Sequence, residues 1–226
     1  MTRNHDILCI GSVLWDVIGR TDVTMPPGAD RPGRIIRLPG GVAMNIAMTL
    51  RRFGLTPSLL SHVGQDAEGN DLMAACDALG VATDCIARVS GLRTDIYMAV
   101  EGAQGLVAAI ADAHSLEQAG DAILAPLRDG RLGSESAPYT GVAALDGNLT
   151  VDLLRLIAVS PLFTRADLRI APASPGKAER LRPLLGHPKA TFYVNVEEAG
   201  LICGARYETA GPAADGLIGR GARRVL

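Results

Sequence analysis

The sequence of 226 residues has no long hydrophobic run and no long block of like charge. Its apolar stretches fall well short of the ~20 residues that a membrane-spanning helix needs, so we expect no membrane partner. The 22 basic and 24 acidic residues give a formal net charge of −2. Because no charged run is long enough to form a basic arm, nucleic acid is not an expected partner either.

The cysteines are also few. The chain has four, Cys9, Cys76, Cys85 and Cys203, with no Cys-x-x-Cys pair and no histidine at ligand spacing. We therefore expect buried free thiols, the state that is typical of a reducing cytoplasm. The first residues are polar and run directly into an apolar strand, so no signal peptide is visible and a cytoplasmic location is expected.

Short apolar runs alternate with helical periodicity along much of the chain. Strands are predicted at residues 6–10, 58–63, 141–145, 168–170, 191–194 and 223–226. Helices are predicted at residues 42–53, 69–79, 119–127, 150–159, 177–184, 196–203 and 213–219. In the first helix, Ile46, Leu50 and Phe53 fall on one face that we expect to pack on the core. This alternation predicts an α/β fold built from βαβ units and a parallel sheet.

The pattern changes between residues 85 and 110. Three short strands are predicted there, at residues 85–89, 94–100 and 106–110, joined by glycine turns with no helix between them. Such a succession indicates a small antiparallel sheet set apart from the main one.

Two glycine-rich turns carry the most information. Gly40 and Gly41 open a helix in which Asn45 lies one turn further on. Glycine at a helix start lets a ligand approach backbone N–H groups, and an asparagine side chain both donates to and accepts from hydroxyl groups. After Phe53-Gly54, a second turn follows at residues 63–69, Val-Gly-Gln-Asp-Ala-Glu-Gly.

The order and spacing of these turns resemble the N-terminal signature of the ribokinase (phosphofructokinase-B) family of sugar and nucleoside kinases. The resemblance implies a ribokinase-like three-layer α/β sandwich with a mainly parallel sheet and a small β-sheet lid. It covers residues 1–226 as one incomplete domain, with lid segments at about 13–38 and 83–110. The family's ATP-binding part and catalytic base would lie beyond Leu226, so we expect the intact protein to be longer.

The resemblance assigns substrate contacts near the N-terminus. In the family, an aspartate at the place of Asp16 accepts hydrogen bonds from sugar hydroxyls, and glycine and asparagine at the places of Gly40, Gly41 and Asn45 close over the same sugar. Asp16 follows the first strand, and ligands collect at the carboxyl ends of parallel strands. The alternative is that Asp16 is a surface or capping residue.

A third turn, Asp146-Gly147-Asn148, also follows a strand. Asp146 and Asn148 are candidates for substrate contacts, because family members often place an acidic or amide residue here. These residue types also favour ordinary turns and helix caps, which is the alternative.

The phosphate side is predicted from residues 177–198. Lys177 resembles a position near the phosphoryl-transfer site of pseudouridine kinase-like members, although it could be a solvated helix residue. Asn195 and Glu198 match the family's Asn-x-x-Glu motif, which orders waters around Mg²⁺. A glutamate at a helix start is also what the helix dipole favours.

The expected activity is transfer of a phosphoryl group from ATP, with Mg²⁺, to a primary hydroxyl of a sugar or nucleoside, with pseudouridine or another ribosyl compound favoured. Family lids often pair between subunits, so a homodimer through the lid is expected. Asp121 resembles the family's catalytic aspartate but lacks the preceding motif and lies ahead of Asn195, so we expect an exposed helix residue. The alternative function is a catalytically inactive, truncated sugar-binding or oligomerising remnant.

Overall fold

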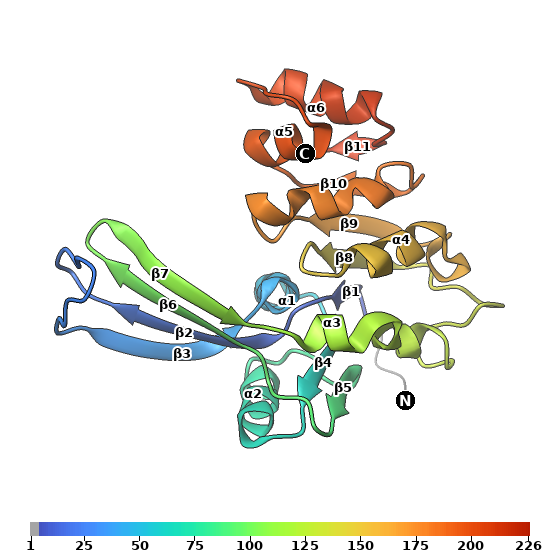
Figure 1. Cartoon of the computed structure of the whole chain (residues 1–226). Coiled ribbons are helices and arrows are strands. Elements are labelled where there is room, and N and C mark those ends of the chain that lie inside the picture. Colours follow the sequence, from blue (N-terminus) through green and yellow to red (C-terminus); the bar gives the residue numbers. More distant parts are fainter. Residues whose placement is uncertain (1–4) are drawn as a thin grey trace.

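The computed structural model describes residues 5–226, which form a large and a small sheet (Figure 1). The large sheet has the strand order β11-β10-β9-β8-β1-β4-β5, and its neighbouring strands are parallel. Its strands are β1 (Ile7–Ile10), β4 (Pro57–Gly64), β5 (Ile86–Val89), β8 (Val142–Asp146), β9 (Asp167–Ala171), β10 (Ala190–Phe192) and β11 (Arg224–Val225). The predicted α/β class with a parallel sheet is confirmed.

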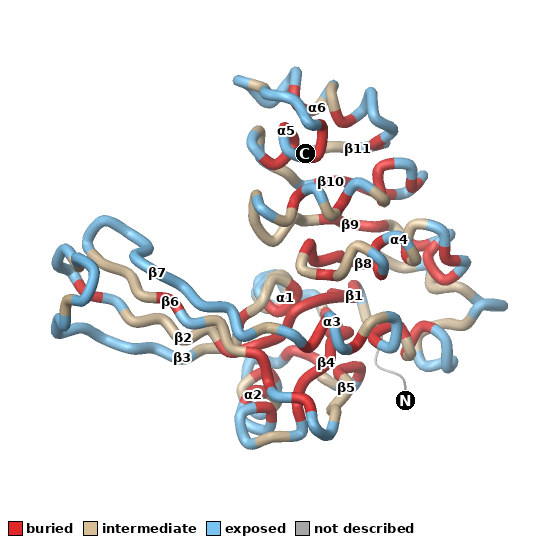
Figure 2. Tube along the Cα trace, in the orientation of Figure 1, coloured by how far each residue is buried: buried red, intermediate tan, exposed pale blue. Residues whose placement is uncertain are grey.

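β1 and β4 are buried along their length (Figure 2), and helices cover both of their faces because their side chains alternate between two apolar clusters. β9 and β10 contribute to only one of these clusters. Cys9 and Leu59 pack with α1 (Val42–Arg52) and α2 (Ala67–Ala78) on one face. Leu8 and Leu60 pack into the larger cluster on the other face. The helices of that face are α3 (Ser115–Ala119), α4 (Val151–Val159), α5 (Val196–Cys203), α6 (Ala210–Gly219) and the 3-10 helices Gly120–Leu127, Pro161–Phe163 and Pro175–Leu184.

The small sheet projects from this body as a separate lid (Figure 1). Its strands are β2 (Leu14–Arg20), β3 (Arg34–Gly40), β6 (Ile96–Gly102) and β7 (Gly105–Asp112), in the order β3-β2-β6-β7. The β2–β3 and β6–β7 pairs are antiparallel, but β2 and β6 are parallel. The predicted small antiparallel sheet is therefore confirmed within each hairpin but not between them, because both hairpins leave the body on their first strand and these two outward strands pair.

The predicted start of the second lid segment, at about residue 83, needs correction. β5 joins the large sheet, where Ser61 to Gly64 of β4 pair in parallel with Ile86 to Val89. β4, α2 and β5 form a βαβ unit, and such a crossover returns the chain to the edge of the sheet that it left. The lid's second segment therefore begins at β6.

Two predicted helices are 3-10 helices in the structure. Residues 119–127 divide into the end of α3 and a 3-10 helix that contains Pro126, and residues 177–184 lie in one that contains Pro183. Proline has no N–H to donate to the carbonyl four residues earlier, so neither segment completes a regular α-helical ladder.

The sequence's prediction for the cysteines is confirmed: all four lie within the described residues as buried free thiols. Burial raises the pKa of the Cys9 thiol to about 12, which keeps it protonated. Among the helices within residues 5–226, none is long and apolar enough to cross a membrane.

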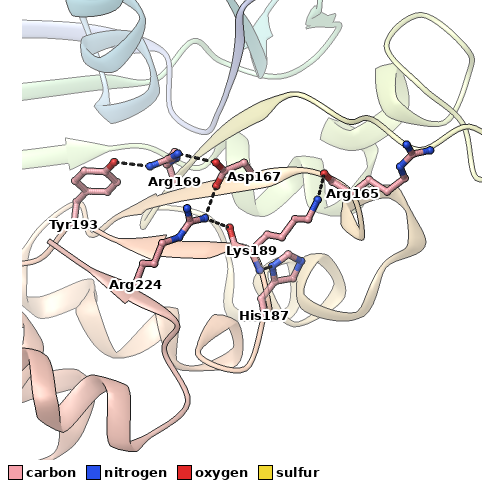
Figure 3. A network of polar contacts seen from close by, with 7 residues as sticks. All are labelled: Arg165, Asp167, Arg169, His187, Lys189, Tyr193 and Arg224. Atoms are coloured by element: carbon pink, nitrogen blue, oxygen red, sulfur yellow. Dashed lines mark hydrogen bonds and ion pairs between the residues drawn. The ribbon is translucent and has the colours of Figure 1, made fainter.

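A polar network joins β9, β11 and the residue after β10 (Figure 3). The Asp167 carboxylate accepts hydrogen bonds from Arg169 and Arg224, and Arg169 also donates to the Tyr193 hydroxyl. Arg224 also donates to the carbonyl oxygen of Lys189, just before β10, and Lys189 Nζ donates to the carbonyl oxygen of Arg165, before β9. These groups are partly exposed, so each ion pair stabilises the fold by at most about 1 kcal/mol.

The core prediction can be tested on two phenylalanines. Phe192 in β10 is fully buried, whereas Phe53, predicted to face the core, is 81% exposed just after α1 ends. Phe192→Ala should lower the free energy of unfolding by about 3–5 kcal/mol through lost burial and a residual cavity. Phe53→Ala should change it by less than about 0.5 kcal/mol. Urea denaturation measures both, and equal losses would contradict this assignment of the core.

Candidate active site

A cavity of about 440 Å³ lies where the lid meets the carboxyl ends of the large sheet. Lid residues and the segment after the lid line one part of it: Leu14, Asp16, Asp95, Tyr97, Ala111, Ala113, Leu116 and Glu117. The turns after β1 and β8, the start of α1 and the segment after β9 line the rest: Ser12, Gly41, Val42, Asn45, Asn148, Ala173, Ser174, Lys177 and Arg180. The cavity therefore joins segments from most of the chain.

The lid presents Asp16 to this cavity. The pairing of β2 with β3 and β6, and of β6 with β7, aligns Asp16 with Leu38, Tyr97 and Ala111 in one row across the sheet. Burial raises the pKa of the Asp16 carboxyl above its ordinary value. Gly40 does not line the cavity. A Cβ at Gly40 would overlap the Asp16 carboxylate, so this glycine provides the space that Asp16 occupies.

The second glycine of the pair shapes the start of α1. Gly41 is the N-cap with φ +92°, a conformation that favours glycine. A Cβ there would also lie 2.5 Å from the Ser12 carbonyl oxygen, so this turn packs tightly against the turn after β1. Asn45, one turn into α1, is exposed and lines the cavity. The structure therefore brings Asp16, Gly41 and Asn45 together, as the sequence predicted.

Asp146 lies under the cavity and does not line it. Its carboxylate has no exposed surface, and it accepts hydrogen bonds from Ser12 N (2.8 Å), Ser12 Oγ (2.5 Å) and Asn148 N (2.7 Å). Burial raises the pKa of Asp146, while these hydrogen bonds act in the opposite direction. The predicted substrate contact of Asp146 is corrected accordingly: because its oxygens bond to protein donors, the residue joins two loops.

Asn148, from the same turn, does line the cavity. Its Nδ2 donates to Ser12 Oγ (3.3 Å), and Lys177 Nζ donates to its Oδ1. Arg180 Nη1 lies 3.4 Å from the Asn148 carbonyl oxygen. The structure thus places two cations, Lys177 and Arg180, beside Asn148 and in the same cavity as Asp16.

Asn195 and Glu198 are not among the residues that line this cavity. They form a capping box at the start of α5, just after β10: Asn195 Oδ1 accepts from Glu198 N (2.8 Å), and Glu198 Oε2 accepts from Asn195 N (2.9 Å). These bonds satisfy N–H groups that a helix start leaves free. An ordinary role at the helix start is the alternative that the sequence left open for this pair. Asp121, as expected, lies in a 3-10 helix, is exposed and pairs with Arg128 (2.9 Å).

Sequence reasoning missed several residues of the site, above all Ser12. Its hydroxyl donates to Asp146, accepts from Val42 N (2.9 Å) and accepts from Asn148, so it links the turn after β1 to α1 and to the turn after β8. The available signal in the sequence was the position of Ser12 beside Gly11, directly after a buried strand, where site residues collect in a parallel sheet. Asp95 was also missed: it is buried and accepts from His114 N, Ser115 N and Ser115 Oγ.

Comparison with known proteins supplies the family. The model of the pfkB family carbohydrate kinases matches residues 4–226. The chain belongs to this family. The uncharacterized sugar kinase YeiI of Escherichia coli is 31% identical over 191 residues, which are 83% of this chain and 50% of YeiI. Pseudouridine kinase of Escherichia coli is 35% identical over 100 residues, 44% of this chain and 32% of that protein. The chain thus spans about half, or less, of the length of these relatives.

Solved structures share the fold of this chain. Ribokinase from Giardia lamblia superimposes with a TM-score of 0.78 at 17% identity, covering 98% of this chain and 68% of that one. At this identity the likeness concerns the fold alone. The predicted ribokinase-like α/β fold of this pfkB kinase chain is confirmed.

The hydrogen bonds of Ser12 join the turn after β1 to α1 and to the turn after β8, and this Ser12 joint can be tested against a matched serine. Ser12→Ala removes a donor to the buried Asp146 carboxylate and should lower the free energy of unfolding by about 1–3 kcal/mol. Ser61 is equally buried, but its hydroxyl has no partner in the described structure, so Ser61→Ala should be neutral or slightly stabilising. Denaturant titration compares the two. Equal effects would show that the Ser12 hydroxyl adds nothing to the joint.

Proposed function

We propose that the whole protein phosphorylates a primary hydroxyl of a sugar or nucleoside, using ATP. One observation carries this proposal. A carboxylate and an amide suited to a sugar, Asp16 and Asn45, share a cavity with two cations suited to phosphate, Lys177 and Arg180. The cavity of about 440 Å³ is within the range of ordinary small-molecule sites.

In this proposal the sugar binds between the lid and α1. The Asp16 carboxylate accepts hydrogen bonds from two neighbouring hydroxyls, while Asn45 both donates and accepts. The backbone at Gly41 forms the floor. Asn148, held between Ser12 and Lys177, is the proposed contact from the turn after β8.

The cations would act on the transferring group. Lys177 and Arg180 offset the negative charge on the phosphate oxygens while the phosphoryl group is transferred. ATP supplies the phosphoryl group. We place Mg²⁺ near Glu198 through water, with Asn195 beside it on the phosphate side, since Mg²⁺ keeps several waters and uses few protein carboxylates. One oxygen of Glu198 already accepts from Asn195 N, which fits an indirect contact only. We assign no general base among residues 5–226.

The favoured substrates are ribosyl compounds, pseudouridine first. The identity to pseudouridine kinase supports this choice, and so does the row of Tyr97 and Ala111, which leaves an aromatic surface beside a small side chain next to Asp16. The second candidate function is sugar binding without phosphorylation, for which the cavity with Asp16 and Asn45 would be sufficient.

A substitution at Asp16 tests the proposal. Asp16→Asn removes the charge and half of the acceptor capacity, so substrate KM should rise about 10- to 100-fold. Because burial raises the pKa of Asp16, wild-type affinity should fall as the pH drops through that raised value, and the variant should lose this dependence. ADP formation is measured with a panel of pentoses, hexoses and nucleosides.

The matched control is Asp22→Asn, an exposed residue just after the same strand, which should behave as wild type. Unchanged kinetics of Asp16→Asn would remove Asp16 from the site. Turnover of fructose but of no nucleoside would overturn the substrate preference. Calorimetric binding of a sugar with no ADP formation by the full-length protein would favour the second candidate.

We further propose that two copies pair through their lids. Ile35, Met98 and Ile110 are 78%, 44% and 63% exposed and lie on the lid face opposite Asp16, in neighbouring rows of the sheet. Clustered apolar side chains on an exposed sheet mark interaction surfaces. A second copy can cover them with the same residues.

Light scattering tests the pairing. The wild-type protein should have twice the monomer mass, and Ile35→Asp with Ile110→Asp should give the monomer mass, because a charge buried in an apolar interface is costly. Val159→Asp, a 79% exposed apolar residue outside the lid, serves as the control and should remain dimeric. A monomeric wild-type protein would contradict the proposal.

A further inference from the structure

The second glycine-flanked turn of the sequence, residues 63–69, lies outside the cavity, and the proposed chemistry does not use it. Asp66 is the N-cap of α2, and its Oδ1 accepts from Gly69 N (2.8 Å). This bond alone would make Asp66 an ordinary capping residue.

The Asp66 carboxylate also reaches beyond its own helix. Its Oδ2 accepts from Thr94 N (2.8 Å), and its Oδ1 accepts from Thr94 Oγ1 (2.5 Å). Thr94 stands two residues before β6, and the next residue, Asp95, lines the cavity. One carboxylate thus holds both the start of α2 and the root of the lid strand that carries Tyr97.

The same turn of α2 holds the lid's other central strand. Trp15 in β2 donates from Nε1 to the Glu68 carbonyl oxygen (2.9 Å). The Arg37 guanidinium from β3 stacks on the Trp15 ring at 3.9 Å and lies 3.6 Å from Asp71 of α2. The two central lid strands, β2 and β6, are therefore fixed to one helical turn where the lid begins.

The glycines of the turn make this contact possible. A Cβ at Gly69 would lie 2.7 Å from Thr94 Oγ1, and a Cβ at Gly64 would lie 2.8 Å from Thr94 N. A Cβ at Gly69 would also lie 2.2 Å from the Gly64 carbonyl oxygen, and one at Gly64 would lie 2.4 Å from the Leu92 carbonyl oxygen, so neither position has room for a side chain beside Thr94. The two glycines of the turn thus leave the space in which Thr94 reaches the Asp66 carboxylate.

We infer that Asp66 is a positioning residue: through Thr94 it sets the orientation of the lid and thereby the places of Tyr97 and Asp16 in the cavity. The effect on substrate affinity rests on the proposed function. The attachment of the lid to α2 does not, and the two parts have separate measurements.

Asp66→Asn separates the lid contact from the helix cap. Asparagine caps helices well, and its oxygen can still accept from Gly69 N. Its amide nitrogen then faces Thr94 N, where two donors meet and that hydrogen bond is lost, while the oxygen can still accept from Thr94 Oγ1. Thr94→Val removes the hydroxyl and leaves the cap untouched. The matched control is Asp77→Asn, on the same helix, whose carboxylate accepts from Thr83 Oγ1 (3.0 Å) away from the lid.

The first measurement reports directly on the lid root, which is the set of contacts that Trp15 and Thr94 make with α2. Trp15 is the single tryptophan and is 6% exposed, so its fluorescence reports on the attachment without any substrate. In Asp66→Asn and Thr94→Val, its emission should move to longer wavelength and its quenching by acrylamide should increase, while Asp77→Asn should match wild type. Wild-type fluorescence in both lid-root variants would overturn the attachment.

The second measurement is the KM of the best substrate from the panel. Both lid-root variants should raise KM about tenfold or more, and the double variant should raise it further, because the two substitutions remove different hydrogen bonds of the same contact. Altered Trp15 fluorescence with unchanged KM would overturn the positioning role. If the wild-type protein neither binds nor phosphorylates any sugar or nucleoside, the proposed function fails, and Trp15 fluorescence alone decides the attachment.

Discussion

The hydrogen bonds of the buried Asp146 carboxylate hold together the floor of the site. They join two loops that are 134 residues apart in sequence, at the carboxyl ends of the neighbouring strands β1 and β8. A carboxylate without water is costly unless donors satisfy it. Ser12 and Asn148 provide three donors, and the Ser12 hydroxyl in turn accepts from the first N–H of α1. The positions of Gly41 and Asn45 depend on this joint.

The parallel sheet explains why such a joint exists. In a parallel sheet every strand ends at the same edge, so turns from distant parts of the chain meet there. Asn148 and Lys177 follow successive strands and meet across the cavity for this reason. The lid supplies the cover over this edge of the sheet. The aligned row of Asp16, Tyr97 and Ala111 covers the cavity. Asp66 and the Glu68 carbonyl of α2 hold the lid in place by accepting hydrogen bonds from it.

The glycines of the two turns have a physical reason that sequence reasoning did not give them. For Gly40 and Gly41, close approach of a ligand was the expected cause, and Gly41 does line the cavity. In the structure, the space at Gly40, Gly41 and Gly69 is taken by protein atoms, namely the Asp16 carboxylate, the Ser12 carbonyl and the Thr94 hydroxyl. Glycine allows close approach in either case. A sequence shows that space is needed, and only the fold shows what fills it.

By itself the sequence determined the α/β class, most element positions and the buried thiols, because periodicity, turn residues and spacing are local properties. The grouping of Asp16, Gly41 and Asn45 was implied by the resemblance to the ribokinase family. The tertiary structure alone decided that Asp146 is buried, that β5 joins the large sheet and that Phe53 lies in solvent. It also decided that Ser12 and Asp66 bridge distant segments. Whether a polar atom meets a ligand or another part of the chain depends on which segments approach in space, and local sequence does not contain that information.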